Sequence, residues 1–403
     1  LSNLSDDRMR HAKSGSWWET EPQRALSNNS VCYTEKPDIG TFMREWLALY
    51  DSKSGERGIF NRQSAQAQAA KYERRDPNIQ YGTNPCSEII LRPKQFCNLS
   101  EVVVRASDTI ETLEKKIELA TILGTIQSCF TDLKGLSKQW TRNTEEERLL
   151  GVSLTGIMDN MMMSNKTEDN LEEILDKLRL HAVAVNKKWA KKLDIEASTA
   201  ITCVKPSGTV SQLVDAASGI HPRHNTYYIR TIRADKKDPL TQFLIDQGFP
   251  HEDASEKPDS TTVFSFPIAA PEGAITRRDM TAIEHLKLWK IYADNWCEHK
   301  PSITVSVKED EWLGIANFVY QNFDSMSGIS FLPMTEHTYK QAPYQDVSKE
   351  QWNEALLSMP KEVYWESFAH YETEDRTTGS QEFACTANSC EIVDFPTPIS
   401  VAQ

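Results

Sequence analysis

The amino-acid sequence predicts an α/β protein with a buried, largely parallel sheet or barrel. Three observations favour this class: the β-type runs are short, they are apolar, and helical patterns separate several of them. The β-type runs lie at 199–204, 226–233, 261–267, 301–306 and 328–332, and the helical patterns among them lie at 239–247, 279–294 and 309–322. Strands that alternate with helices in this way are typical of sheets covered by helices.

Helical patterns dominate the part of the chain that precedes these runs. They are expected at 41–50, at 62–72 within an otherwise loop-like region, and at about 170–193. A further long helix repeats Ile110, Leu113 and Ile117 at intervals of three and four, and Asp108 or Ser107 can cap its start. From about Thr373 the composition turns polar, which predicts a flexible tail.

Composition and charge narrow the functional classes. The chain has 403 residues, of which 39% are hydrophobic and 26% charged, and this balance is typical of a packed globular protein. A net charge of −13 argues against a non-specific nucleic-acid binder. No apolar run approaches ~18 residues, so no membrane span is expected. The chain begins at Leu1 with no visible secretory signal, so we expect a processed protein or a piece of a longer one.

Eight cysteines are too few for a disulfide scaffold of this length, so we expect reduced thiols in a cytoplasmic setting. The sharpest cysteine motif is the segment 83–91. If its backbone is extended, Asn84, Cys86 and Glu88 point to one face. An amide to orient, a thiol to react and a carboxylate to take a proton make a plausible site. An exposed edge strand with an incidental cysteine explains the spacing equally well.

A second thiol, Cys97, follows a turn-like stretch at 92–96 that could bring it back towards Cys86. Such a pair could form a reactive dithiol, half of a metal site, or two unrelated core thiols. The separation is too long for a usual zinc knuckle.

The segment 202–211 indicates a strand, a turn of small residues and the start of a helix. Backbone N–H groups at such a turn can bind phosphate, and the hydroxyl groups of Ser207, Thr209 and Ser211 could add donors. An ordinary capping turn is the alternative.

The polar tail carries Cys385 and Cys390, which favour a dithiol that exchanges electrons over half of a metal site. Two histidines lie close together in another part of the chain, His221 and His224. A proline lies between them, and we assign no metal to them.

Together these motifs resemble the catalytic component of a ribonucleotide reductase, specifically the adenosylcobalamin-dependent class II. Residues 84–88 (Asn-Pro-Cys-Ser-Glu) resemble the family's radical-site finger loop, and Cys97 matches the position of a family redox cysteine. Residues 205–211 resemble its substrate-phosphate loop, and the terminal Cys-x4-Cys resembles the shuttle pair of its C-terminal arm.

The resemblance implies roles for these residues. Cys86 would carry a thiyl radical that abstracts the 3′-hydrogen of a ribonucleotide, Glu88 would act as the base on the 3′-hydroxyl group, and Asn84 would hold the ribose hydroxyl groups. Cys97 would be one member of the cysteine pair that supplies electrons. Phosphate would be bound by Pro206, Ser207, Gly208, Thr209, Val210 and Ser211. Cys385 and Cys390 would accept electrons from thioredoxin or a similar dithiol reductant.

The resemblance also implies boundaries and partners. Residues 1–372 would form roughly the second half of a ten-stranded α/β barrel with a finger loop, and 373–403 the flexible tail. The other active-site redox cysteine and the effector region would precede Leu1, so a separately supplied N-terminal half is expected and the chain alone should be inactive or nearly so. Adenosylcobalamin is the expected cofactor, and similarity favours ribonucleoside triphosphates as substrates. No nucleic-acid, membrane or metal site is expected.

Three alternatives stay open at this point. The chain could be the large subunit of an iron-dependent reductase. It could be a catalytically inactive reductase fragment that acts as a binding protein. It could also hold zinc through the cysteines at 86, 97, 385 and 390.

Overall fold

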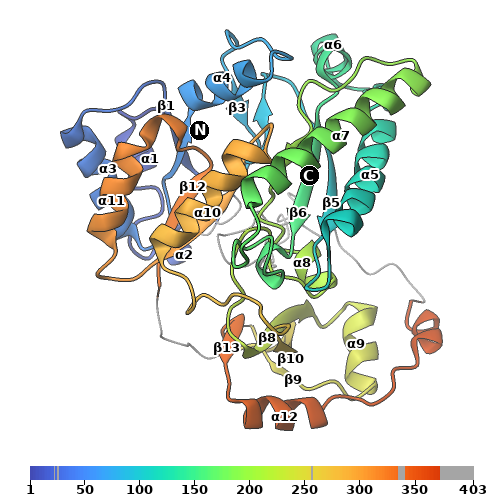
Figure 1. Cartoon of the computed structure of the whole chain (residues 1–403). Helices are drawn as coiled ribbons and strands as arrows, with labels where there is room; N and C mark the ends of the chain where they lie inside the picture. The colour runs from blue at the N-terminus through green and yellow to red at the C-terminus, as the bar shows by residue number, and fades with distance from the viewer. Residues whose placement is uncertain (22, 25–26, 256, 335–340, 373–403) are drawn as a thin grey trace, which may run out of the picture. The chain divides into compact units, whose positions relative to one another are not determined.

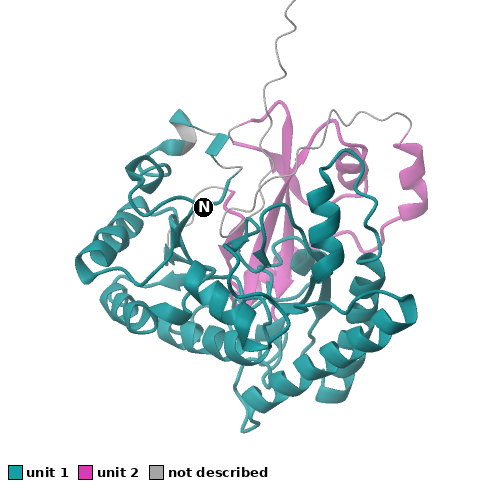
Figure 2. Cartoon of the chain, turned by 90° about the horizontal axis from the view of Figure 1, so that it is seen from above, with its two compact units in different colours: residues 1–223, 271–335 teal, residues 224–270, 336–403 magenta. Residues whose placement is uncertain are grey.

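A computed structural model describes the chain except for residues 22, 25–26, 256, 335–340 and 373–403. It divides into two compact units, which Figure 2 shows in teal and magenta. Unit 1 comprises residues 1–223 and 271–335, and unit 2 comprises 224–270 and 336–403. The predicted redox pair of the tail, Cys385 and Cys390, lies outside the described residues.

Unit 1 contains a parallel three-stranded sheet, β5–β6–β7, and a four-stranded sheet in the order β1–β2–β12–β11. Strands β11 and β12 are parallel, β2 runs antiparallel to β12, and β1 is parallel to β2. A parallel bridge between Val204 and Pro301 joins the end of β7 to the start of β11. Five parallel strands therefore follow one another across the two sheets. Within the described residues this arrangement does not close into a barrel.

The strands of unit 1 are β1 (Ser30–Tyr33), β2 (Gly58–Asn61), β3 (Gly82–Thr83), β4 (Ile90–Leu91), β5 (Asn98–Val103), β6 (Leu150–Thr155), β7 (Thr202–Cys203), β11 (Ile303–Val307) and β12 (Ile329–Pro333). Its helices are α1 (Asp7–Arg10), α2 (Trp17–Thr20), α3 (Ile39–Ser52), α4 (Arg62–Lys71), α5 (Ile110–Gln127), α6 (Lys138–Glu147), α7 (Leu171–Leu193), α8 (Val210–Leu213), α10 (Ala282–Asn295) and α11 (Trp312–Gln321), with 3-10 turns at Ile157–Asp159 and Phe323–Ser325.

The long helices α5 and α7 lie side by side, and α5 packs on β5 and β6 (Figure 1). The predicted caps of α5, Asp108 and Ser107, lie one and two residues too early, because Thr109 is the residue that caps the helix. Thr109 and Thr112 form a reciprocal capping box, while Asp108 instead accepts a hydrogen bond from the Thr112 hydroxyl group. Helix α7 starts after the Asn170 cap, as its pattern predicts.

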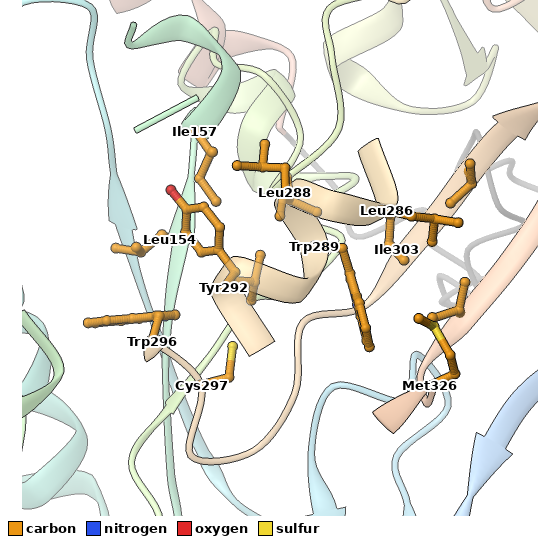
Figure 3. Packing of buried hydrophobic residues seen from close by; sticks show 14 of the residues in the cluster. Leu154, Ile157, Leu286, Leu288, Trp289, Tyr292, Trp296, Cys297, Ile303 and Met326 are labelled. Atoms are coloured by element: carbon orange, nitrogen blue, oxygen red, sulfur yellow. The ribbon is translucent and has the colours of Figure 1, made fainter. Parts of the chain in front are cut away.

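The core of unit 1 is built around α10. Trp289, Tyr292 and Trp296 point from this helix and its C-cap into the hydrophobic cluster (Figure 3) and are at most 1% exposed. The indole N–H of Trp296 donates to the carbonyl oxygen of Cys203 at 2.8 Å, and that of Trp289 donates to the carbonyl oxygen of Pro301 at 2.9 Å. Buried indole groups thereby fix the two strand ends that meet at the bridge.

Unit 2 has an antiparallel sheet in the order β13–β8–β10–β9. Its elements are β8 (Tyr227–Asp235), α9 (Pro239–Asp246), β9 (His251–Asp253), β10 (Thr261–Ala269), β13 (Tyr344–Asp346), α12 (Lys349–Leu357) and a 3-10 helix at Trp365–His370. The expectation that the runs at 226–233 and 261–267 join a parallel sheet is wrong, because β8 and β10 pair antiparallel. Many of their residues are only partly buried, which suits an antiparallel sheet with one solvated face.

Several strands were not predicted. Sequence patterning indicated no strand at 30–33, 58–61, 98–103 or 150–155, yet these residues form β1, β2, β5 and β6. None of the helices among the described residues is long and apolar enough to cross a membrane.

Candidate active site

The motif around Cys86 forms the tip of a β-hairpin. Strands β3 and β4 pair antiparallel, with Thr83 opposite Ile90, and the loop 84–89 connects them. Ser87 has a φ of +65° and its N–H donates to the carbonyl oxygen of Asn84 at 3.0 Å. The expected extended backbone is therefore wrong: the chain turns where alternation was assumed. The turn nevertheless brings Asn84 close enough to the Glu88 carboxyl group to lower its pKa, and the Asn84 side-chain oxygen accepts the Ile89 N–H at 3.1 Å.

Two consecutive residues that precede β11, His299 and Lys300, hold the hairpin against the rest of unit 1. The Nδ1 atom of His299 accepts the N–H of Ile90 at 3.3 Å, and its Nε2 atom lies 2.9 Å from the carbonyl oxygen of Leu150 on β6. The N–H of Lys300 donates to the carbonyl oxygen of Glu88 at 3.0 Å. An imidazole that accepts at one nitrogen and donates at the other is neutral, and burial holds the pKa of His299 well below its usual value.

One face of the β5–β6–β7 sheet carries the other chemical groups. Cys97, Leu99 and Glu101 alternate along this face, while Asn98, Ser100 and Val102 between them are buried on the opposite face.

Gly151 on β6 allows close packing at this face. A Cβ atom at this position would lie 2.4 Å from Leu99 Cδ2, 3.1 Å from Ile89 Cδ1 and 3.4 Å from Cys203 Sγ. The hairpin residue Ile89 therefore approaches the same sheet face that carries Cys97.

The carboxyl group of Glu88 is buried in this region, with the residue 1% exposed. Burial raises its pKa, and the charge of Glu101 adds to the increase, whereas Asn84 and Lys205 oppose it. Burial also raises the pKa of Cys97 to about 12, and the charge of Glu88 adds to that increase. Cys97 is therefore a protonated thiol at neutral pH, and a buried base lies near it.

Three buried oxygen atoms here have no hydrogen-bond partner among the described residues. They are Glu88 Oε2, Glu101 Oε2 and Ser207 Oγ. Ser207 and Glu101 are neighbours, although the hydroxyl group forms no hydrogen bond of ordinary geometry. Buried polar atoms in native proteins are normally satisfied by protein, water or ligand. A ligand with hydroxyl groups would supply the missing donors to the two carboxylates.

The segment 205–211 forms the turn that its sequence indicated. The N–H of Lys205 donates to Ser153 Oγ at 2.9 Å, and Ser207 has a φ of +53°. A helical turn, α8, starts at Val210.

The members of this turn differ in exposure. Gly208, Thr209 and Val210 are exposed, Lys205 and Pro206 are partly buried, and Ser211 is buried with its hydroxyl group 2.8 Å from that of Ser218. The exposed backbone can be reached by a ligand, whereas Ser211 holds the turn in place.

Sequence reasoning assigned no role to Asn28, Glu101 or His299, and it named Lys205 only as the first residue of the 205–211 motif. Glu101 could have been found, because it alternates with Cys97 and Leu99 along a segment whose strand was not predicted. His299 could not, since only the tertiary structure brings it under the hairpin. His221 is half-buried, and its ring nitrogens lie 2.9 Å from the carbonyl oxygen of Ser218 and 2.9 Å from the backbone nitrogen of Thr304. The described residues contain no group of three or more His, Cys, Asp and Glu side chains that could hold a metal ion.

Comparisons with known proteins agree with the motif resemblance. An adenosylcobalamin-dependent ribonucleoside-triphosphate reductase from Euglena gracilis is 29% identical over 86% of this chain and 47% of its own length. The corresponding protein from Lactobacillus gasseri is 27% identical over 82% of this chain and 48% of its own length. The chain resembles part of an adenosylcobalamin-dependent ribonucleotide reductase. No protein-family model matches it.

The fold agrees as well. A B12-dependent class II ribonucleotide reductase matches 92% of this chain and 55% of its own chain, with a TM-score of 0.73 and 21% identity. A class Id reductase α subunit from Actinobacillus ureae matches 76% of this chain with a TM-score of 0.55 and 15% identity. The chain spans about half the length of the curated reductases that it matches. The predicted resemblance to the class II reductases is confirmed.

Proposed function

We propose that this chain carries the radical-bearing half of an adenosylcobalamin-dependent reductase that converts ribonucleoside triphosphates into 2′-deoxyribonucleotides for DNA synthesis. The observation that supports this most is the placement of the Cys86 hairpin on the sheet that carries Cys97, with a buried Glu88 oxygen that lacks a partner. The relatives with similar sequences are themselves named adenosylcobalamin-dependent ribonucleoside-triphosphate reductases.

Cys86 is the group that would meet the cofactor. Its side chain is half-buried at the hairpin tip, next to the exposed Pro85, whereas Glu88 is buried two residues later. This arrangement suits a thiol that must be reached from one side and act on substrate from the other. Adenosylcobalamin, when bound, supplies an organic radical that can remove a hydrogen atom from a thiol. In its thiyl form, Cys86 would take the 3′-hydrogen atom of the ribose and return it at the end of the reaction.

Glu88 and Asn84 would act on the ribose hydroxyl groups. A carboxylate whose pKa is raised by burial is a stronger base than an exposed one, so Glu88 can take the proton of the 3′-hydroxyl group. Asn84, which lies beside Glu88 and lowers its pKa, would hydrogen-bond the ribose hydroxyl groups. Loss of the 2′-hydroxyl group as water then requires one proton, and its overall replacement by hydrogen consumes two electrons and two protons.

Cys97 would supply the proton and share the electrons. With its pKa near 12, this thiol holds a proton at neutral pH and can give it to the leaving hydroxyl group. Oxidation of two thiols to one disulfide releases two electrons and two protons, so a second thiol is needed. We propose that it comes from an N-terminal reductase half, which together with this chain would complete the ten-stranded barrel.

The roles of the phosphate turn and of the two tail cysteines follow from the same motif resemblance. The exposed turn at 208–210 would bind the substrate phosphates through backbone N–H groups, with Pro206, Ser207 and Ser211 shaping it. Cys385 and Cys390 would reduce the active-site disulfide by exchange and be reduced in turn by thioredoxin or a similar dithiol, which implies a cytoplasmic enzyme.

The proposal is tested by mixing the chain with the N-terminal half of a related reductase and a ribonucleoside triphosphate. Deoxyribonucleotide that forms only when adenosylcobalamin and a dithiol are present supports it. Turnover that ignores adenosylcobalamin and requires a separate radical-generating subunit would favour the iron-dependent alternative. The higher TM-score against the class II structure favours the first result.

A further inference from the structure

The hairpin tip that carries Cys86 is contacted by a residue from a distant part of the chain. Asn28 lies just before β1, 57 positions before Pro85. Its Nδ2 atom donates to the carbonyl oxygen of Pro85 at 3.0 Å and lies 4.0 Å from Cys86 Sγ. One amide group therefore reaches both the backbone and the sulfur of the tip.

Neighbouring residues hold Asn28 in place. Asn29 is 6% exposed, its Nδ2 atom donates to the carbonyl oxygen of Met9 at 2.8 Å, and its side-chain oxygen lies 3.3 Å from the Ser2 hydroxyl group. Its backbone carbonyl accepts the N–H of Gly58 at 3.0 Å, at the point where β1 begins to pair with β2. Asn29 is thus an anchor within the fold, and the adjacent Asn28 is directed at the hairpin.

We propose that Asn28 is a positioning residue for Cys86. Its amide N–H groups restrain the tip through the Pro85 carbonyl and offer a hydrogen to the sulfur. An amide NH2 group donates and cannot take a proton from a thiol, so Asn28 orients the sulfur without acting as its base. A donor beside sulfur also favours the thiolate over the thiol. The catalytic meaning of this contact rests on the proposed function, whereas the contact itself does not.

The contact can be measured in the 403-residue chain without cofactor or substrate. Each cysteine is alkylated with iodoacetamide over a range of pH, and each modified peptide is quantified by mass spectrometry. Asn28→Asp keeps the shape of the side chain but replaces the donor with a negative charge, and Asn28→Ala removes the group. Asn317→Asp, on the exposed surface of α11, is the matched control for the added charge. Glu88, the acidic side chain of the same hairpin, is unchanged throughout.

The alkylation midpoint of Cys86 should rise by about 0.5 to 1 pH unit in Asn28→Asp, which slows alkylation at neutral pH roughly 3- to 10-fold. A smaller rise is expected in Asn28→Ala and none in Asn317→Asp. Two other thiols report on folding, because Cys129 is exposed and Cys203 is fully buried. Cys129 should react equally in every variant and Cys203 in none.

An unchanged Cys86 midpoint in both Asn28 variants, with Cys203 still protected, would overturn the proposal. If Cys203 becomes reactive in Asn28→Asp, that variant has lost its fold, and the Cys86 midpoint of Asn28→Ala then tests the proposal. A shifted midpoint would support the contact even if Cys86 later proved unnecessary for nucleotide reduction, so failure of the proposed function is distinguishable from failure of this inference.

Discussion

His299 and Ile90 are joined by a hydrogen bond in which the imidazole Nδ1 atom accepts the backbone N–H at 3.3 Å. Because the other ring nitrogen reaches Leu150 at 2.9 Å, one buried side chain ties the base of the Cys86 hairpin to β6. Because the two hairpin strands are only two residues long each, we expect this contact to contribute to the positioning of the hairpin on the sheet.

Replacing His299 with Phe should destabilise the protein. The change keeps a ring of similar size but leaves the Ile90 N–H and the Leu150 carbonyl without partners, which costs about 2 to 4 kcal/mol. Urea unfolding followed by circular dichroism measures the loss. The surface variant His251→Phe, at an exposed position in β9, serves as the control. Equal stability of the two variants would mean that the imidazole contributes nothing to the fold.

Replacing Glu88 with Gln should stabilise the protein at neutral pH while abolishing turnover. Because burial raises the pKa of Glu88, the folded state keeps a proton in a pH range where the unfolded state has released it. Stability from this group therefore falls as pH rises through that range. The neutral amide avoids the loss, and we expect a gain of about 0.5 to 2 kcal/mol at pH 8 that disappears below the ordinary glutamate pKa. Thermal unfolding at several pH values tests this, and a lower melting temperature at pH 8 would contradict it.

Gly151→Ala should disturb the sheet face under the hairpin. The added methyl group would meet Leu99 at 2.4 Å and Ile89 at 3.1 Å, so overpacking should cost about 1 to 3 kcal/mol. Gly124→Ala in α5 is the matched control, since its methyl group would meet Leu150 at an ordinary 3.4 Å and would favour the helix. Unfolding free energies should diverge in sign between the two variants. A Gly151→Ala variant as stable as the original chain would show that Leu99 and Ile89 move aside freely.

Lys300→Met should stabilise the protein most at neutral pH and below. Lys300 is buried, its Nζ atom donates to the Ser327 hydroxyl group at 2.6 Å, and the ammonium group lies 4.1 Å from the Phe60 ring centroid. Burial lowers its pKa to about 7. Between that pKa and the usual value the unfolded state binds a proton that the folded state lacks, so stability rises with pH over that window.

Methionine removes this cost and can pack on Phe60. We therefore expect a gain of about 1 to 3 kcal/mol at pH 7 and a flatter dependence of stability on pH up to about 9. Denaturant unfolding across this range provides the measurement. An unchanged pH slope would show that Lys300 does not titrate in that window.

Short motifs with a chemical meaning could be predicted from the sequence, and the contacts that organise them could not. The spacing of Asn84, Cys86 and Glu88 indicated a site, but the alternation argument placed them on an extended strand. The chain turns there because Ser87 has a positive φ, and the residue types of this segment do not predict that backbone conformation. Helices with strong periodicity, such as α7, were predicted closely. Strand β6 was missed because it is buried along its whole length and shows no alternation.

The site also depends on residues from distant segments. Asn28 and His299 meet the hairpin only through the pairing of β1 with β2 and the bridge that precedes β11, and local patterns do not encode such pairings. The antiparallel pairing in unit 2 could not be predicted either, because strands separated by a helix can pair in a parallel or an antiparallel way.

The central claim is that Cys86 carries the radical that acts on the ribonucleotide. The most direct test compares the original chain with Cys86→Ser, each mixed with the N-terminal half of a related reductase, adenosylcobalamin, a dithiol and a ribonucleoside triphosphate. We predict that the original chain forms deoxyribonucleotide and that Cys86→Ser forms none, although both stay folded by circular dichroism. Deoxyribonucleotide formation by Cys86→Ser at the rate of the original chain would contradict the account.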